Sequence, residues 1–300
     1  MNRNHGNITN TIYNTTILFH PDLHMQEINN WKEKLIAIVE QIPSKADSLK
    51  PMIQFFVLTL SPTKIYVLNH GNEDDNSEYI DFFIVISGKT GVPFTELEPI
   101  LNIAYLKDQR LSCSLHNEGN VLEGLRNGHI FYSLNFIPAN LVYDDNVLEY
   151  PVTSKEALQT MKQQTLEKFI GYHAKAIDFY ESALSLNKNR STSITLFMLH
   201  QATELIFRGI LVSLNGYDKK THEIQALKKY IRRCAQPLNK CLPDITESEK
   251  QSLDILNSAY LRARYEENYA IRDEDRAYLF EKIMELLSFS KTYVEKRLQF

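Results

Sequence analysis

The stretch Phe197–Leu227, FMLHQATELIFRGILVSLNGYDKKTHEIQAL, decides how the chain is interpreted. Its apolar residues recur at helical spacing, so they predict a buried helix, a turn at Asn215-Gly216 and a second helix. His200, Glu204 and Arg208 are four positions apart, which places them on one helix face as a polar ladder. Two interpretations stay open: an internal network that locks this helix to its neighbours, or a polar pocket for a nucleotide or an RNA phosphate.

Helical patterns continue on both sides of this stretch and fill residues 155–300. They predict five helices: one over 155–187, one over Thr192–Asn215, one starting at the N-cap residue Thr221, one starting at the capping box of Thr246–Glu249, and one capped by Asp273. Five helices with short links predict an all-α, up-and-down bundle.

The preceding residues 25–150 mix helical and strand patterns. Helices are predicted over 26–42, 51–60 and 93–106, strands over 63–68, 79–86 and 110–116, a helix and a break over 118–134, and a final strand or loop over 135–143. This order predicts an α/β domain, and therefore an α+β chain when the bundle is included. Residues 1–24 read as a poorly specified arm.

Composition narrows the class of protein. The chain has 300 residues, 43% of them hydrophobic, a net charge of -4 and three cysteines without a CxxC pair. The overall charge argues against a general polyanion binder, although Lys219–Arg233 is locally basic and is either a solvated helix face or an RNA-facing surface. The sequence has neither a signal-peptide pattern nor an apolar run of membrane length, so we expect a cytoplasmic protein without a membrane partner.

The C-terminal half resembles the HEPN domain, a four-to-five-helix bundle. The residues that carry the resemblance are Phe197–Arg208, Gly216-Tyr217 with Thr221-His222, and Ala263-Arg264-Tyr265 with Tyr269. The resemblance covers about 155–300. It implies a homodimer formed through the bundle, which brings two copies of the Arg264 region together.

Ribonucleases of this family carry an Arg and, after four to six residues, a His. Here Arg262 and Arg264 are followed by Tyr265 and Tyr269, and the bundle's His residues lie elsewhere. A tyrosine is a poor base at neutral pH, so acid–base chemistry depends on His200 or His222 being brought close by the fold. The two arginines either form ion pairs with Glu266 and Glu267 or bind phosphate beside the tyrosine rings. Thr221-His222 is either a helix N-cap or an anion site.

Residues 50–150 resemble, more loosely, a minimal nucleotidyltransferase domain. Asn69-His70-Gly71 stands where that family has a Gly-Ser turn, and Tyr79-Ile80-Asp81 stands where it has two carboxylates. The third carboxylate position falls at Ser112 or Ser114. Two-metal transfer needs clustered carboxylates, and only Asp81 is present, so we expect a vestigial site and no Mg²⁺ cofactor. Glu73–Asp75 is expected to be a solvated turn.

The function predicted from the sequence is a nucleotide- or RNA-binding regulatory protein without nucleotidyltransferase activity. The alternatives are a HEPN-type ribonuclease of a defence or toxin–antitoxin system and a structural interaction module. We predict no catalytic residue and no metal ligand. The predicted ligand-binding residues are His200, Glu204, Arg208, His222, Arg262, Arg264, Tyr265 and Tyr269.

Overall fold

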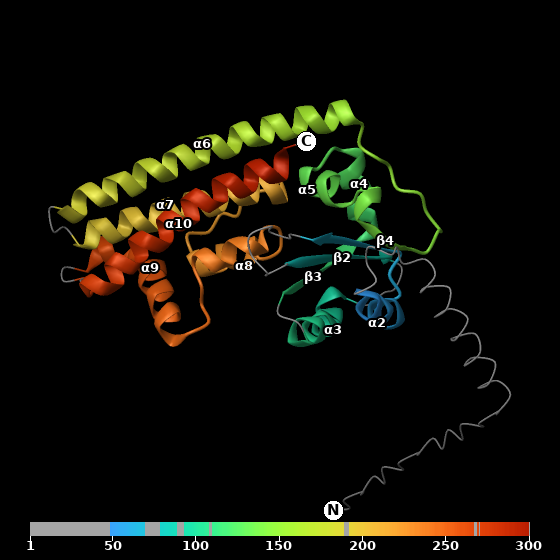
Figure 1. Cartoon of the computed structure of the whole chain (residues 1–300), viewed down its shortest axis with the longest axis horizontal. Coiled ribbons are helices and arrows are strands. Elements are labelled where there is room, and N and C mark those ends of the chain that lie inside the picture. Colours follow the sequence, from blue (N-terminus) through green and yellow to red (C-terminus); the bar gives the residue numbers. More distant parts are fainter. Residues whose placement is uncertain are drawn as a thin grey trace, which may run out of the picture.

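The computed structural model describes residues 49–69, 79–88, 93–107, 110–188, 192–266, 269 and 271–299. A four-stranded sheet with its own helices comes first, and a region of long helices follows (Figure 1). This confirms the predicted mixed class with the strands in the N-terminal half. The predicted arm at 1–24, the predicted helix at 26–42 and the acidic turn at 73–75 lie outside the described residues.

The sheet contains β1 (Lys64–Asn69), β2 (Ile80–Ile86), β3 (Leu111–Asn117) and β4 (Leu141–Asp144), in the spatial order β3-β2-β1-β4. β1 is antiparallel to β2 and to β4, whereas β2 and β3 are parallel. β2 is buried along its whole length, as is typical of a central strand covered on both faces. β3 is buried at Leu111 and half-buried from Ser112 to Asn117, and it contacts α3 and α4.

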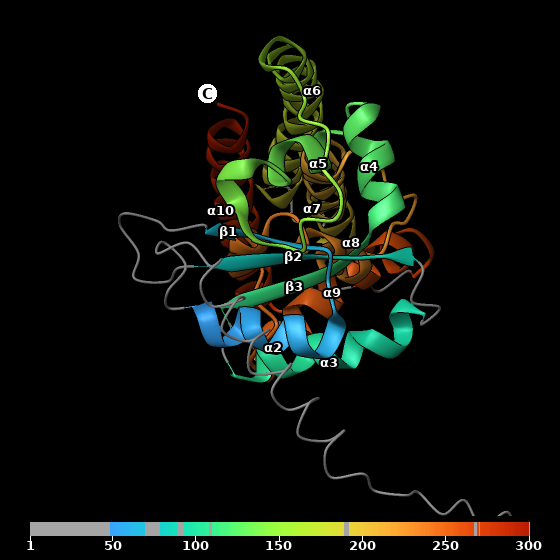
Figure 2. The ribbon, with the colours of Figure 1, turned by 90° about the vertical axis from the view of Figure 1, so that its right-hand side faces the viewer.

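Helices cover both faces of the sheet (Figure 2). α2 (Lys50–Leu60) and α3 (Phe94–Lys107) lie on one face, where Phe56 of α2 packs against Phe82 with ring centroids 5.6 Å apart. α4 (Glu118–Arg126) and α5 (Ile130–Asn135) lie on the other face, where Phe131 packs against Phe83 at 5.6 Å. Successive side chains of a strand point to opposite faces, so Asp81 lies on the same face as Phe83.

The C-terminal helices are α6 (Lys155–Lys188), α7 (Thr192–Ile210), α8 (Ile224–Ile231), α9 (Glu247–Tyr265) and α10 (Asp273–Leu298). α6, α7 and α10 run side by side along the length of this region, and α8 packs against α7 and α9 (Figure 1). Two short segments interrupt the pattern: a π-helix, η4 (Leu211–Asn215), directly after α7, and a 3₁₀-helix, η5 (Gln236–Cys241), after α8. None of the described helices has the length and apolar character needed to span a membrane.

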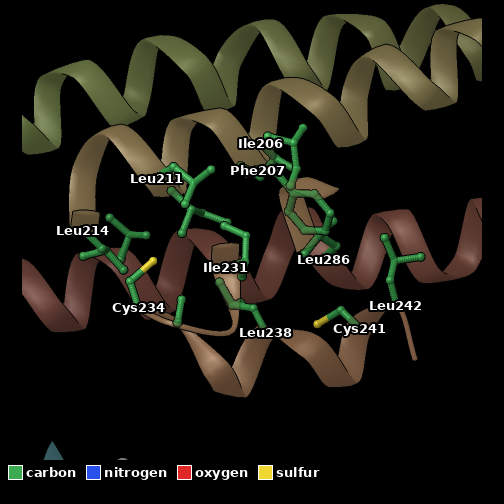
Figure 3. Close-up of a cluster of buried hydrophobic side chains, with 14 of the residues drawn as sticks. Ile206, Phe207, Leu211, Leu214, Ile231, Cys234, Leu238, Cys241, Leu242 and Leu286 are labelled. Atoms are coloured by element: carbon green, nitrogen blue, oxygen red, sulfur yellow. The ribbon is translucent and has the colours of Figure 1, made fainter. Parts of the chain in front are cut away.

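The hydrophobic core of the helices extends into the sheet. Figure 3 shows Phe207, Leu211 and Leu214 from α7 and η4 facing side chains of α8, η5 and α10, including Ile231, Leu238 and Leu286. The same cluster contains Phe83, Phe131 and Phe136 from the sheet and its helices. A second, smaller cluster fills the space between the sheet and α2 and α3. The first cluster therefore crosses the predicted boundary near residue 150.

The ends of the helices test the local predictions. Thr246 and Glu249 form the predicted capping box, and Gly216 ends η4 with the left-handed φ of 79°. The N-cap prediction for Thr221 is wrong: α8 begins at Ile224, because the chain before it is extended and its backbone is held by α7. Asp273 is the first helical residue rather than the cap, which is Arg272.

Candidate functional site

Glu204 on α7 is the centre of a polar network. The residue is only 3% exposed, and Arg208 Nη1 donates a hydrogen bond to Glu204 Oε1 at 3.1 Å. The Nδ1 atom of His222 lies 3.1 Å and 3.0 Å from the two carboxylate oxygens. Because an ionised carboxylate only accepts, His222 Nδ1 carries the proton and donates the hydrogen bond. The His222 side chain is 53% exposed, so this network opens to solvent at His222.

His200 is fully buried at the inner end of the ladder. Its Nε2 lies 2.9 Å from the carbonyl oxygen of His222, so Nε2 carries the proton and donates. Nδ1 then accepts from the amide nitrogen of Gln201 at 3.2 Å, and that amide also donates to Glu204 at 3.4 Å. Burial lowers the pKa of His200 to about 4, so the ring is neutral at pH 7. His200 therefore positions the backbone of His222.

Arg208 continues the ladder toward the loop after η4. Its Nε donates to Asp218 Oδ1 at 2.9 Å, and its Nη2 donates to the other oxygen of the same carboxylate. These bonds to Asp218, together with the bond to Glu204, raise the pKa of Arg208 above its ordinary value. His200, Glu204 and Arg208 thus bond to one another or to neighbouring protein groups, which is the arrangement of the internal-network interpretation. Arg208 anchors the loop that carries His222.

Tyr260 on α9 connects this network to the surface. The His222 ring stacks on the Tyr260 ring at 4.3 Å with an interplanar angle of 9°. The guanidinium carbon of Arg264 lies 4.1 Å from the centre of the same ring, and Arg264 Nε donates to the Tyr260 carbonyl at 2.7 Å. Tyr265 follows with 76% of its surface exposed and lies 5.4 Å from the Arg264 guanidinium. We call His222, Tyr260, Arg264 and Tyr265 the α8–α9 surface.

Arg262 and Tyr269 do not join this surface. Two helical positions separate Arg262 from Arg264, so their side chains leave opposite sides of α9. Arg262 forms a two-oxygen ion pair with Glu266, as the i,i+4 spacing predicted, and packs over the Tyr269 ring at 4.5 Å. Tyr269 is buried, and its hydroxyl donates to the Ile255 carbonyl at 2.9 Å. Because burial also raises its pKa, Tyr269 is unsuited to act as a base where the family's ribonucleases have a His.

The basic tract Lys219–Arg233 is only partly solvated. Lys228 is buried and pairs with Asp244 at 2.9 Å, and Arg232 binds the same carboxylate with bonds of 2.7 Å and 2.8 Å. Lys219 instead lies over the Tyr230 ring at 4.3 Å. The interpretation of this tract as a solvated helix face is therefore wrong for Lys228, which is buried and paired with Asp244.

Asp81 of the predicted vestigial motif lies inside the protein. The residue is 2% exposed, and its charge raises the pKa of the Cys113 and Cys234 thiols and of the Tyr293 phenol beyond the effect of burial. Ser112 donates a hydrogen bond to the Arg232 carbonyl, and the Ser114 hydroxyl bonds to His116. Among the described residues, no three His, Cys, Asp or Glu side chains lie together as metal ligands. Asp81 therefore lies on the face of the sheet that packs against the helical region.

Three residues of this site were absent from the sequence prediction: Gln201, Asp218 and Tyr260. Gln201 and Asp218 lie within Phe197–Leu227, but neither shares the four-residue spacing of the ladder. Tyr260 lies four residues before Arg264, and this helical spacing is the one sequence signal that could have placed it beside that guanidinium. Its stacking on His222 joins α9 to a distant loop, which no local pattern signals.

Comparisons with known proteins give a family match for part of the chain. No curated protein matches the chain. Residues 172–293, which run from within α6 to within α10 and contain the whole α8–α9 surface, match the family model of the HEPN domain.

Proposed function

We propose that the protein binds single-stranded RNA on the α8–α9 surface. HEPN domains are typically RNA-binding modules or ribonucleases, which sets the class of function. The observation that carries the proposal is the stack of His222 and Arg264 on Tyr260. It holds a planar cation and an imidazole ring at the surface, beside the exposed ring of Tyr265. Arg264 supplies charge for a phosphate, while His222 and Tyr265 supply faces on which bases stack.

Binding of a short fluorescent RNA, followed by anisotropy at several salt concentrations, tests this function. Arg264→Gln should weaken binding and lower the slope of log K against log salt by about 0.7, the value expected for one phosphate contact on a single strand. Tyr265→Ala should weaken binding by about tenfold through lost stacking. Arg126→Gln, an exposed arginine on α4, serves as the matched control. Equal affinities for all four proteins would refute the proposal.

The proposal includes a homodimer formed through the bundle. Leu261 is a large apolar residue that is 58% exposed on α9, and it lies one helical turn from Arg264. A second copy packed here would bring two Arg264 side chains near one RNA strand. Light scattering of the wild type and of Leu261→Asp measures this, and a wild-type mass of one chain at high concentration contradicts it.

The proposal also treats the sheet region as a degenerate nucleotidyltransferase-like domain without transfer activity. Its support is the burial of Asp81 against the helical region and the serines at the expected carboxylate positions. Incubation with Mg²⁺ and labelled nucleoside triphosphates checks this. Transfer of label to protein or RNA that disappears in Asp81→Asn would overturn it.

A ribonuclease is the second candidate, and the Glu204–His222 pair favours it. Glu204 accepts the hydrogen bond from His222 Nδ1, so in the neutral imidazole the lone pair is on Nε2, which can accept the proton of a ribose 2′-hydroxyl. The 2′-oxygen then bonds to the neighbouring phosphorus, and the bond to the 5′-oxygen breaks. That oxygen leaves with a proton from water, while Arg264 offsets the charge on the phosphoryl oxygens.

Cleavage of end-labelled RNA in the presence of a chelator separates this candidate from simple binding. The expected product has a 2′,3′-cyclic phosphate, and His222→Gln should slow its formation at least about 100-fold. His173→Gln is the control, since His173 on α6 bonds to the Leu287 carbonyl of α10 and is not part of the α8–α9 surface. An uncut RNA with the wild type, or equal rates with His222→Gln, eliminates the ribonuclease and leaves the binding proposal standing.

A further inference from the structure

A polar cavity lies away from the α8–α9 surface, where the sheet region meets the long helices. It has a volume of about 670 Å³ and is bounded by α4, α5, α6 and the end of η4. Pockets that hold small molecules have volumes of about 300–1,000 Å³ and are frequent where two parts of a chain meet. The size and place of this cavity are therefore those of a small-molecule site.

Two helices present one face each to this cavity. On α4 and at its C-cap the lining residues are Asn120, Glu123, Gly124 and Asn127, and on α6 they are Met161, Gln164, Thr165 and Lys168. Both sets follow the spacing 0, 3, 4 and 7, which is one continuous stripe on a helix. Apart from Met161 and the glycine, each stripe consists of polar side chains. Thr165 is buried, whereas the hydrogen-bonding groups of the other polar residues are exposed and can reach a ligand: Asn120, Glu123, Asn127, Gln164 and Lys168.

Two aromatic rings at the cavity are held rigidly against glycine backbone. A Cβ atom on Gly124 would lie 2.2 Å from the Tyr132 ring, and one on Gly216 would lie 2.6 Å from the His129 ring. Gly216 also has the left-handed φ of 79°, which side-chain-bearing residues rarely adopt. Both rings line the cavity, so it has flat walls whose positions are fixed before any ligand arrives.

The His129 ring adds no positive charge to the cavity wall. Burial lowers the pKa of His129, so the ring that lines the cavity is neutral at pH 7. An uncharged ring suits stacking on a flat ligand.

The groups around the cavity identify the class of ligand. Asn120, Asn127 and Gln164 each offer a donor and an acceptor side by side, the arrangement that pairs with the edge of a nucleobase. The rings of Tyr132 and His129 offer surfaces for its face. Glu123 can accept from the hydroxyls of a ribose, and Lys168 is a point charge suited to a phosphate. Neither the Glu123 carboxylate nor the Lys168 ammonium group forms an ion pair within the described part of the chain.

We propose that the cavity between α4, α5 and α6 binds a nucleoside or its 5′-monophosphate, with the base between the carboxamides and the rings, the ribose at Glu123 and any phosphate at Lys168. This site is separate from the α8–α9 surface and does not depend on RNA binding there.

Calorimetric titration of the full chain with adenosine, guanosine, cytidine, uridine and their 5′-monophosphates tests the proposal. At least one of these compounds should bind, and Glu123→Gln and Gln164→Leu should each weaken it by about tenfold. Lys168→Gln should weaken only a monophosphate, and an unchanged affinity in this variant identifies the nucleoside itself as the ligand. Lys175→Gln, two turns further along the same helix, is the matched control.

A second measurement guards against variants that disturb the fold. In the NMR spectrum of the wild type, the imidazole nitrogens of His129 should shift when the ligand is added, while those of His173, bonded to the Leu287 carbonyl, stay unchanged. The proposal is wrong if none of the compounds binds at millimolar concentration. It is also wrong if a compound binds equally well to Glu123→Gln, Gln164→Leu and the wild type without shifting the His129 signals.

Discussion

At the scale of single residues, Glu204 determines how the site is built. Its carboxylate accepts hydrogen bonds from Arg208, Gln201 and His222 Nδ1, although the residue is almost fully buried. A buried charge is tolerated only when several partners satisfy it, and removing its charge leaves those partners uncompensated. Glu204 is therefore both a structural requirement and the group that sets the tautomer of His222.

The first prediction concerns this carboxylate. Glu204→Gln keeps the size of the side chain but loses the charge and one acceptor, so the free energy of unfolding should fall by roughly 3 kcal/mol. Urea unfolding measures the change. Glu181→Gln, on the exposed side of α6, should change stability by less than about 0.5 kcal/mol. Similar stabilities for the two variants would mean that the network contributes nothing.

The second prediction concerns pH and His200. Its pKa of about 4 in the folded protein lies below the ordinary 6.5, so the unfolded chain binds this proton more readily. The contribution of His200 is complete above about pH 6.5 and is lost as the pH falls toward about 4, a difference of about 3 kcal/mol. His116, whose pKa burial lowers to about 3, acts in the same direction.

Urea unfolding at about pH 7.5 and at about pH 4.5 checks this. The wild type should lose stability between the two values, and His200→Gln should lose markedly less because one of the groups with a lowered pKa is gone. An equal loss in both proteins would contradict the assignment of a buried neutral imidazole to His200.

At this scale the sequence predicted what helical spacing controls and missed what the fold brings together. The ladder of His200, Glu204 and Arg208 follows from positions on one helix. The partners Asp218 and Tyr260 come from a loop and from another helix, and the ion pair of Lys228 with Asp244 joins residues across a turn. Such pairings depend on tertiary packing, so spacing along the chain carries no signal for them.

At the scale of elements, the segment between α7 and α8 does most to shape the site. α7 does not continue to Asn215 as an α-helix but ends in the π-helix η4, after which Gly216 turns the chain. The extended residues that follow bring His222 back to Glu204. The capping box at Thr246 was predictable because its partners are three residues apart. The start of α8 was not predictable, because contacts with α7 hold the preceding residues extended.

A pair of glycines gives the third prediction. Gly216→Ala forces a Cβ into the left-handed region and within 2.6 Å of the His129 ring, so stability should fall by roughly 2–4 kcal/mol. Gly171→Ala in the middle of α6 meets no atom within 4 Å and should raise stability by about 0.5–1 kcal/mol. Thermal or urea unfolding of both variants compares them. Changes of the same sign would show that backbone conformation at Gly216 is unimportant.

At the scale of the whole molecule, the sheet and the helices share one hydrophobic cluster. Phe83, Phe131 and Phe136 belong to the same cluster as Phe169 and Phe207. Arg297 of α10 also donates to the Asn135 side chain at 2.7 Å across this contact. The order of strands and helices in the sequence predicted the two regions. Their contact depends on which faces remain apolar after each region forms, and it could not be read from either region alone.

The fourth prediction is that both regions unfold together. Cys113 on β3 and Cys241 at the end of η5 report on the two regions, and burial raises the pKa of each thiol to about 12, which suppresses its reactivity in the folded protein. Pulsed thiol labelling across a urea series should give one midpoint for both cysteines. Arg297→Gln should lower the two midpoints equally. Labelling of Cys113 at distinctly lower urea than Cys241 would show two independent units.

The π-helix has a consequence that concerns chain length rather than side-chain chemistry. Glu204 and His222 are separated by 18 positions, and η4 contains the wider turn that makes this count fit. Because a π-turn holds one residue more than an α-turn, deleting one residue from 211–215 would let the segment close as an α-turn, and the following chain would leave it in nearly the same direction. Inserting one more residue would instead turn everything that follows by about 100° around the axis, so His222 would miss its carboxylate although every group of the site is still present. The length of this segment therefore tolerates the loss of one residue better than the gain of one, and the chemical character of aligned residues would not reveal this.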